Sequence, residues 1–160
     1  MNELDQRLAG ETAGGMHRWL SPQKPPAVKR YVEVQGWRFF YLDGRRARDK
    51  ASFLQTAADV MAFPAYFGHN WDAFEESIND LAWAPASGYV LLYDHVWWFA
   101  CTHPADWQVA REILQAACER WASQNRPFVV FLRHTHGCSG VADLLVAPRP
   151  HQRALRARLW

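Results

Sequence analysis

The chain has 160 residues, 49% of them hydrophobic, and a formal net charge of +2 at pH 7. This is the size of one ordinary domain with enough apolar residues to bury a core. No run approaches the roughly 18 apolar residues of a membrane span, and the first residues lack the apolar stretch of a signal peptide. The three cysteines are widely spaced and form no CxxC motif, which predicts reduced thiols and a cytoplasmic protein.

The charges are strongly segregated along the chain, although they almost cancel in total. Residues 51–110 contain seven acidic residues and no lysine or arginine, a formal charge of −7. Residues 1–50 have a balance of +4 and residues 111–160 a balance of +5. Such a distribution creates a local field that attracts a cationic partner to the middle segment.

In chain order, the first segment is rich in turn residues and the second in β-forming residues. Residues 1–27 hold several glycines and prolines and predict a loosely ordered arm with one turn of helix near 4–8. Residues 28–34 (VKRYVEV) alternate in polarity, and residues 37–42 (WRFFYL) are aromatic and apolar. We expect these two runs to form an antiparallel hairpin, which adds a strand at the N-terminal side of the sheet.

Helices are then expected between strands. Asp49 or Ser52 can cap a helix that ends by Pro64. The continuous apolar runs 89–94 (YVLLYD) and 127–132 (PFVVFL) are typical of strands buried on both faces, and a helical pattern separates them. The order predicts an α/β fold with a small three-stranded parallel sheet, packed with about four helices.

The stretch from Phe63 to Leu81 predicts an aromatic loop followed by a short amphipathic helix. Asn70 is a good N-cap, and Gly68 supplies backbone freedom just before it. At about 100° per residue, four apolar side chains fall within an arc of about 80° that faces the core. They are Trp71, Phe74, Ile78 and Leu81.

The other face of this helix carries only acidic charges. Asp72, Glu76 and Asp80 are spaced four apart, with Glu75 and Asn79 beside them and no lysine or arginine among them. Each such like-charge pair disfavours the helix by roughly 0.2 to 0.5 kcal/mol. One interpretation is an ordinary solvated face. The other is a binding surface whose missing cations come from a partner, which the local charge of −7 favours.

The motif P-x-Y-x-G-x-N-x-D-A at Pro64 to Ala73, followed by a carboxylate four residues after the aspartate, closely resembles the barstar family of intracellular ribonuclease inhibitors. The similarity extends over residues 39–132. It implies a barstar-like domain at 28–133, with an arm at 1–27 and an extension at 134–160. It also implies a cytoplasmic immunity protein or antitoxin that occludes the active site of a cationic nuclease toxin, with no enzymatic activity and no cofactor.

In this family the loop and second helix enter the phosphate-binding cleft of the enzyme, and carboxylates stand in for substrate phosphates. The resemblance places Tyr66 in that loop, Asn70 at the cap, Asp72 in the first turn, Glu76 at the central carboxylate and Glu119 on the third helix. The full set of expected partner-binding residues is Tyr66, Phe67, Gly68, Asn70, Asp72, Glu75, Glu76, Asn79, Asp80, Trp83 and Glu119.

Three rival interpretations use other parts of the same chain. His134, His136 and Cys138 form H-x-H-x-C, which is conceivable as a zinc site but has no clear fourth ligand, so no metal is expected. A basic tail with Arg149, Arg153, Arg156 and Arg158 is a candidate for direct contact with nucleic acid. It lacks interleaved aromatic residues, however, and its residues favour a solvated helix face. The third interpretation is an adaptor that uses the barstar fold for a partner other than a nuclease.

Overall fold

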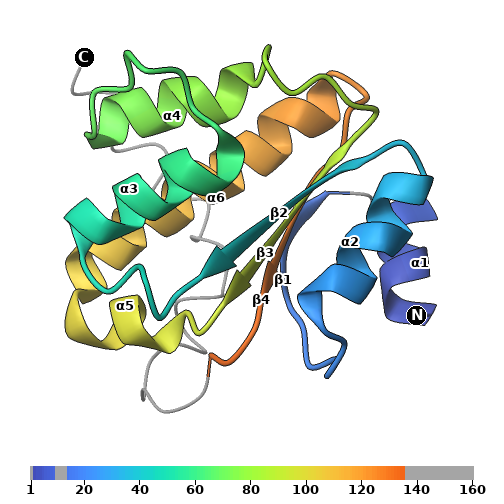
Figure 1. The fold of residues 1–160 in the computed structure, drawn as a ribbon, viewed down its shortest axis with the longest axis horizontal. Coiled ribbons are helices and arrows are strands. Elements are labelled where there is room, and N and C mark those ends of the chain that lie inside the picture. Colours follow the sequence, from blue (N-terminus) through green and yellow to red (C-terminus); the bar gives the residue numbers. More distant parts are fainter. Residues whose placement is uncertain (1, 10–13, 136–160) are drawn as a thin grey trace, which may run out of the picture.

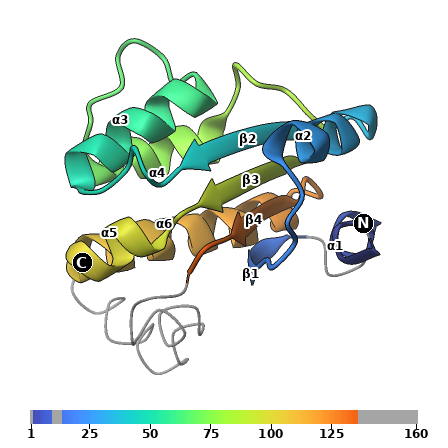
Figure 2. The same ribbon diagram turned by 60° about the horizontal axis from the view of Figure 1, so that its bottom comes forward.

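The computed structural model describes residues 2–9 and 14–135 as an α/β fold of three layers (Figure 1). Its centre is a four-stranded sheet in the order β1-β4-β3-β2, and all three strand pairs are parallel. Figure 2 shows β1 at the edge beyond β4, on the side away from β2. The strands are β1 (Gly15–Arg18), β2 (Arg38–Asp43), β3 (Tyr89–Asp94) and β4 (Phe128–Leu132).

Six helices cover the two faces of the sheet within the described residues. Two of them pack on one face, and the other four pack on the opposite face (Figure 1). The first group is α1 (Asn2–Ala9) and α2 (Pro25–Val34). The second group is α3 (Lys50–Met61), α4 (Trp71–Asp80), α5 (Trp97–Thr102) and α6 (Pro104–Ser123). None of these helices is both long and apolar enough to cross a membrane.

The apolar runs at β3 and β4 form the two central strands, as their sequences predict, and every residue in them is buried. Because successive side chains of a strand point to opposite faces, β3 contributes to two separate cores. Leu91 and Tyr93 pack under α3 to α6, whereas Val90 and Leu92 pack under α1 and α2. Covered faces on both sides account for the absence of a polar alternation in these strands.

The predicted antiparallel hairpin is wrong, and residues 28–34 belong to a helix. Two prolines occupy the first turn of α2, where the missing N–H groups cost nothing. Val28 and Val32 lie one helical turn apart and are both fully buried against the sheet. An alternating run with apolar residues at i and i+4 fits a strand and a helix equally well, and the prolines decide between them.

The position and direction expected for the added N-terminal strand, and the description of the N-terminal arm, also need correction. Residues assigned to the arm contain α1, with Leu4 and Leu8 buried, which confirms the helix expected near 4–8. They also contain the strand β1, which was not expected. β1 pairs parallel to β4, with Gly15 beside Val129 and Arg18 beside Leu132. The sheet therefore has four parallel strands, where three parallel strands and one added antiparallel strand were expected. A four-residue strand with one exposed end carries too little periodicity for detection in the sequence.

The prediction of reduced thiols is correct at Cys118 and wrong at Cys101. Cys118 on α6 is a free, buried thiol, and burial raises its pKa to about 12. Cys101 on α5 is disulfide-bonded. Spacing along the sequence does not reveal which cysteines the fold brings into contact.

Asp49 caps α3, one of the two alternatives that the sequence offers. Its Oδ1 accepts a hydrogen bond from the Ser52 backbone N–H at 2.8 Å, and the Ser52 hydroxyl oxygen accepts one from the Asp49 N–H at 3.1 Å. This reciprocal capping box satisfies two donors at the helix start. The hydrogen bond from the Ser52 backbone also lowers the pKa of Asp49. Both candidate residues thus take part in one cap.

Replacing Gly44 by alanine is expected to destabilise the carboxyl end of the sheet by about 1 to 3 kcal/mol or more. An added Cβ would lie 2.4 Å from the backbone oxygens of Asp94 and of His95, which cannot rotate away. The Gly44 N–H also donates to the Asp94 carbonyl at 2.8 Å, so the clash would break that pairing. Urea unfolding measures the loss. Gly68→Ala, whose nearest neighbour is a side-chain amide nitrogen at 3.1 Å, is the control with a smaller expected cost.

Candidate functional site

The helix α4 begins and faces the core as its sequence predicts. Asn70 Oδ1 accepts a hydrogen bond from the Ala73 N–H at 2.8 Å, which confirms the N-cap. Phe74, Ile78 and Leu81 are almost completely buried, and Trp71 is half-buried. The helix ends at Asp80, and the C-cap residue Leu81 adopts a left-handed conformation with φ of 44°. The packed face therefore turns the carboxylates to the surface.

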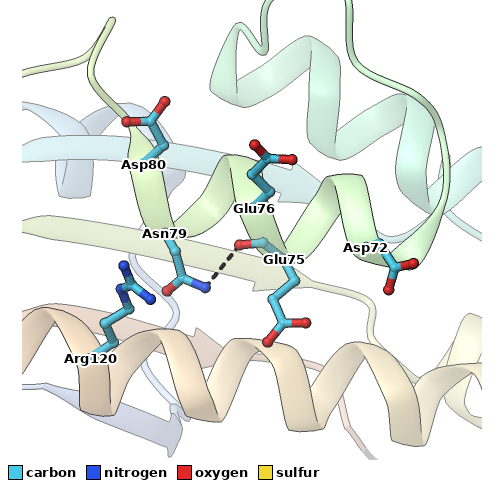
Figure 3. A pocket seen from close by; sticks show the side chains of 6 residues that line it. All are labelled: Asp72, Glu75, Glu76, Asn79, Asp80 and Arg120. Atoms are coloured by element: carbon cyan, nitrogen blue, oxygen red, sulfur yellow. Dashed lines mark hydrogen bonds between the residues drawn. The ribbon is translucent and has the colours of Figure 1, made fainter.

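An acidic groove of about 430 Å³ lies on the outer face of α4 (Figure 3). We call it the acidic groove and define it by Asp72, Glu75, Glu76, Asn79, Asp80 and Arg120. All four carboxylate side chains are exposed. Within the described part of the chain, no lysine, arginine or histidine forms an ion pair with any of them.

The groove has two sides, which Figure 3 separates. Glu75 and Asn79 point toward α6, whereas Glu76 and Asp80 project from the opposite side of α4. Asn79 donates from its amide nitrogen to the Glu75 carbonyl at 2.8 Å, so its side chain folds back on the helix. The carboxylates thus present a curved acidic surface about two helical turns long.

Arg120 is a groove residue that the sequence analysis missed. It projects from the last turn of α6 toward Asn79 (Figure 3). The adjacent Glu119 was expected at this site, but it is not among the groove residues, and it accepts a hydrogen bond from Gln115 at 3.2 Å. The packing of α6 against α4 decides which of two neighbouring side chains reaches the groove, and no local pattern contains that information.

The loop before α4 presents one aromatic side chain and buries another. Tyr66 is 81% exposed, while Phe67 is only 7% exposed and packs against Phe63 with ring centroids 5.0 Å apart. In this conformation Phe67 supports the loop from within, so of these two rings only Tyr66 is available to a partner. Trp83 is half-buried and donates from Nε1 to the Met61 carbonyl at 2.9 Å, which ties the connector after α4 to the end of α3.

His69 holds the loop against α3. Its ring nitrogens lie 3.0 Å from the Phe67 carbonyl oxygen and 2.9 Å from Gln55 Oε1. The left-handed conformation before the cap falls on His69, with φ of 51°, and not on Gly68. The expected backbone freedom of Gly68 is therefore not used. A Cβ there would instead press on the Asn70 amide at 3.1 Å.

Removing the cap of α4 by Asn70→Ala is expected to destabilise the protein by about 1 kcal/mol. The substitution leaves the Ala73 N–H without its side-chain acceptor at the start of a helix that already carries repelling carboxylates. Asn70→Asp restores an acceptor and is the matched control. Urea unfolding of the two variants measures the difference, and equal losses in both would show that the hydrogen bond contributes nothing.

A second polar cluster lies at the carboxyl ends of β3 and β4, away from the acidic groove. Asp94 is 3% exposed, and its Oδ2 accepts a hydrogen bond from Arg133 Nη2 at 2.6 Å. His134 Nδ1 contacts its Oδ1. Burial raises the pKa of Asp94, but the hydrogen bonds and charges of Arg133 and His134 outweigh it and bring the pKa down to about 2. Asp94 therefore carries its charge in the folded protein.

Together, the fold and the acidic groove define a small α/β protein with an exposed anionic surface on one helix. The sequence model of the family described as Barstar (barnase inhibitor) matches residues 37–133, which is more than half of the chain. The chain belongs to the Barstar family. This is a family of ribonuclease inhibitors and not one of enzymes. A search of curated proteins finds no significant match to the chain.

The match covers β2 to β4 and the acidic groove but leaves out α1, β1 and α2. The resemblance seen in the sequence is therefore confirmed at the level of the family. Two of the rival interpretations fall largely on residues outside the described part of the chain. The first is the basic tail. The second is the H-x-H-x-C motif, of which His136 and Cys138 lie outside the described residues.

Proposed function

We propose that this protein inhibits a ribonuclease stoichiometrically by placing α4 and the loop before it over the enzyme's cationic active site. The observation that carries the proposal is the acidic groove, with four exposed carboxylates and no ion-pair partner for any of them within the described residues. The repulsion between these carboxylates destabilises α4 in the free protein. A partner that supplies cations would remove this repulsion, which accounts for the presence of the groove.

The carboxylates act as substitutes for the phosphates of the RNA substrate. A ribonuclease binds phosphate with arginine, lysine and histidine side chains, and these also pair with carboxylates. Asp72 and Glu76, one turn apart, are the residues we assign to direct pairing. Glu75 and Asp80 add to the field, and Asn70 sets the helix start. Tyr66 packs against the rim of the active site, where an exposed ring gains most from burial.

This mode of action fits an immunity or antitoxin role, in which the inhibitor protects the cell from a toxic nuclease. The cytoplasmic location is proposed from this role and not from the thiols, because Cys101 is disulfide-bonded. Membership of the Barstar family supports the ribonuclease as the class of partner. The competing possibility is an adaptor that uses the same groove for a cationic protein other than a nuclease.

Titration of the full chain into barnase, with RNA hydrolysis as the readout, tests the proposal. Activity should fall linearly to zero at one inhibitor per enzyme. A parallel titration uses the ribonucleases of the source organism. Inhibition of any of these enzymes at a 1:1 ratio supports the proposal. Full activity of all of them at a tenfold excess of the chain contradicts it and favours the adaptor.

Salt is expected to slow association between the chain and its nuclease far more than dissociation. Exposed charges steer the encounter over a distance that shrinks with the Debye length, from about 30 Å at 0.01 M to about 8 Å at 0.15 M ionic strength. We expect the association rate to fall at least about tenfold over this range, measured by stopped-flow fluorescence. A rate that does not change with salt would contradict a role for the acidic groove in the encounter.

A further inference from the structure

Two histidines flank the buried carboxylate of Asp94 where β3 and β4 end. Asp94 is the last residue of β3, His95 follows it, and His134 lies two residues after the end of β4. The Asp94 carboxylate, His95 and His134 each offer one ligand atom, and these atoms all lie within 4.8 Å of one another. The acidic groove does not include any of these residues.

We propose that Asp94, His95 and His134 bind a divalent transition-metal ion such as Zn²⁺. Imidazole nitrogen together with carboxylate oxygen is the donor set that zinc and its neighbours prefer. Three protein ligands leave one position for water or for an incoming group in tetrahedral geometry. This proposal is independent of the proposed inhibition. In the acidic groove the carboxylates are proposed to pair with a protein, whereas here the Asp94 carboxylate is proposed to bind a metal ion.

The carboxylate is held in place with one oxygen facing the histidines. Its Oδ2 accepts hydrogen bonds from Arg133 Nη2 at 2.6 Å and from the Tyr41 hydroxyl at 3.3 Å. Arg133 in turn donates to the Gln23 carbonyl at 2.6 Å, so the guanidinium is anchored from behind. Oδ1 accepts a hydrogen bond from the His95 backbone N–H at 3.0 Å, faces His134 Nδ1 and lies 4.0 Å from His95 Nε2. The partners of Oδ2 orient the carboxylate, and Oδ1 has a second lone pair for the ion.

The two imidazoles are near enough to each other to coordinate one ion after rotation of their side chains alone. Their centroids are 4.5 Å apart and their planes differ by 9°, so the rings are stacked. Ligand atoms about 2.0 to 2.2 Å from a tetrahedral ion lie somewhat closer together than 4.0 Å, and each nitrogen lone pair must point at it. The side chains of His95 and His134 are 26% and 42% exposed, which leaves them room to turn toward Oδ1.

Both histidines also have left-handed backbones, with φ of 52° at His95 and 51° at His134. This conformation is uncommon for residues other than glycine. It turns the chain one residue after β3 and two residues after β4, and the two rings stack beside Asp94. An ion bound there would link the ends of the two central strands. It would stabilise the folded state by an amount that rises with the logarithm of the ion concentration once this exceeds Kd.

The test compares Zn²⁺ binding by the full chain, without a polyhistidine tag, and by two single variants. His95→Asn and His134→Asn remove one imidazole each, and asparagine tolerates the left-handed conformation. Both variants keep the ion pair between Asp94 and Arg133. His103→Asn, at the exposed start of α6, is the matched control, because asparagine is a good N-cap there. Competition with a chromogenic chelator measures the affinity, and thermal unfolding with and without Zn²⁺ measures the stabilisation.

We expect the wild-type chain and His103→Asn to bind one equivalent and to unfold at a higher temperature with Zn²⁺. Each of the other two variants should bind at least about tenfold more weakly and lose the thermal shift. Co²⁺ should give visible absorption bands in the wild-type chain that both variants lose. No binding by the wild-type chain, or binding within twofold of wild type in either variant, would overturn the site. An equal loss in His103→Asn would do the same.

Discussion

Replacing Glu76 by lysine is expected to abolish inhibition of the nuclease while the free protein keeps its fold. Glu76 is exposed on α4, so the substitution disturbs no core contact. A lysine there would face the cationic active site that the carboxylate is proposed to fill. Losing one partner of a buried charge pair typically costs about 2 to 5 kcal/mol, and reversal adds repulsion. This corresponds to at least a roughly 30-fold to 4,000-fold weaker complex.

The same substitution should slightly stabilise the free protein. Glu76 lies four residues from both Asp72 and Asp80, and lysine turns two repelling pairs into two attractive ones. We expect a gain of less than about 1 kcal/mol, measured by urea unfolding. Opposite signs for stability and binding are typical of a surface selected for function.

Glu33→Lys is the matched control for this prediction. Glu33 is an exposed glutamate on α2, on the other face of the sheet. Glu33→Lys changes the net charge by the same amount as Glu76→Lys. It should leave the inhibition constant within about threefold of the wild-type value. If a folded Glu76→Lys chain inhibits as well as wild type, the assignment of Glu76 to the interface is wrong. If both variants lose inhibition equally, overall charge and not the acidic groove governs binding.

Replacing Phe53 by alanine is expected to destabilise the protein by about 3 to 5 kcal/mol. Phe53 on α3 is 1% exposed and is the centre of an aromatic cluster that joins α3, α4, α5 and β3. Its ring lies between 5.2 and 5.9 Å from those of Trp71, Phe74, Tyr93 and Phe99. Domains of this size are stable by about 5 to 15 kcal/mol, so the cavity would remove a large fraction of the total.

Val34→Ala provides the control, because Val34 is 82% exposed at the end of α2 and should change stability by less than about 0.5 kcal/mol. Urea unfolding at 25 °C measures both variants. A cost below about 1.5 kcal/mol for Phe53→Ala would show that the aromatic cluster collapses around the gap. Because Phe53 contacts Trp71 and Phe74, we also expect the variant to bind its nuclease more weakly wherever it remains folded.

The acidic helix shows how far a local pattern can be trusted. Its N-cap at Asn70, its buried stripe and its exposed carboxylates all follow from residues within about ten positions of one another, so their geometry was predictable. The family motif lies in the same stretch, and the match over residues 37–133 confirms it. The assignment of particular carboxylates to the interface stays a prediction.

The sequence by itself determined the central strands, the cap and apolar face of α4, the family and the charge of its middle segment. Only the tertiary structure decided that residues 28–34 form a helix, that β1 joins the sheet, and that Arg120 rather than Glu119 borders the acidic groove. It also brought Asp94, His95 and His134 together at the end of the sheet. Local periodicity and capping act between neighbours in sequence. These features depend instead on contacts between distant segments, and β1 and β4 are more than 100 residues apart.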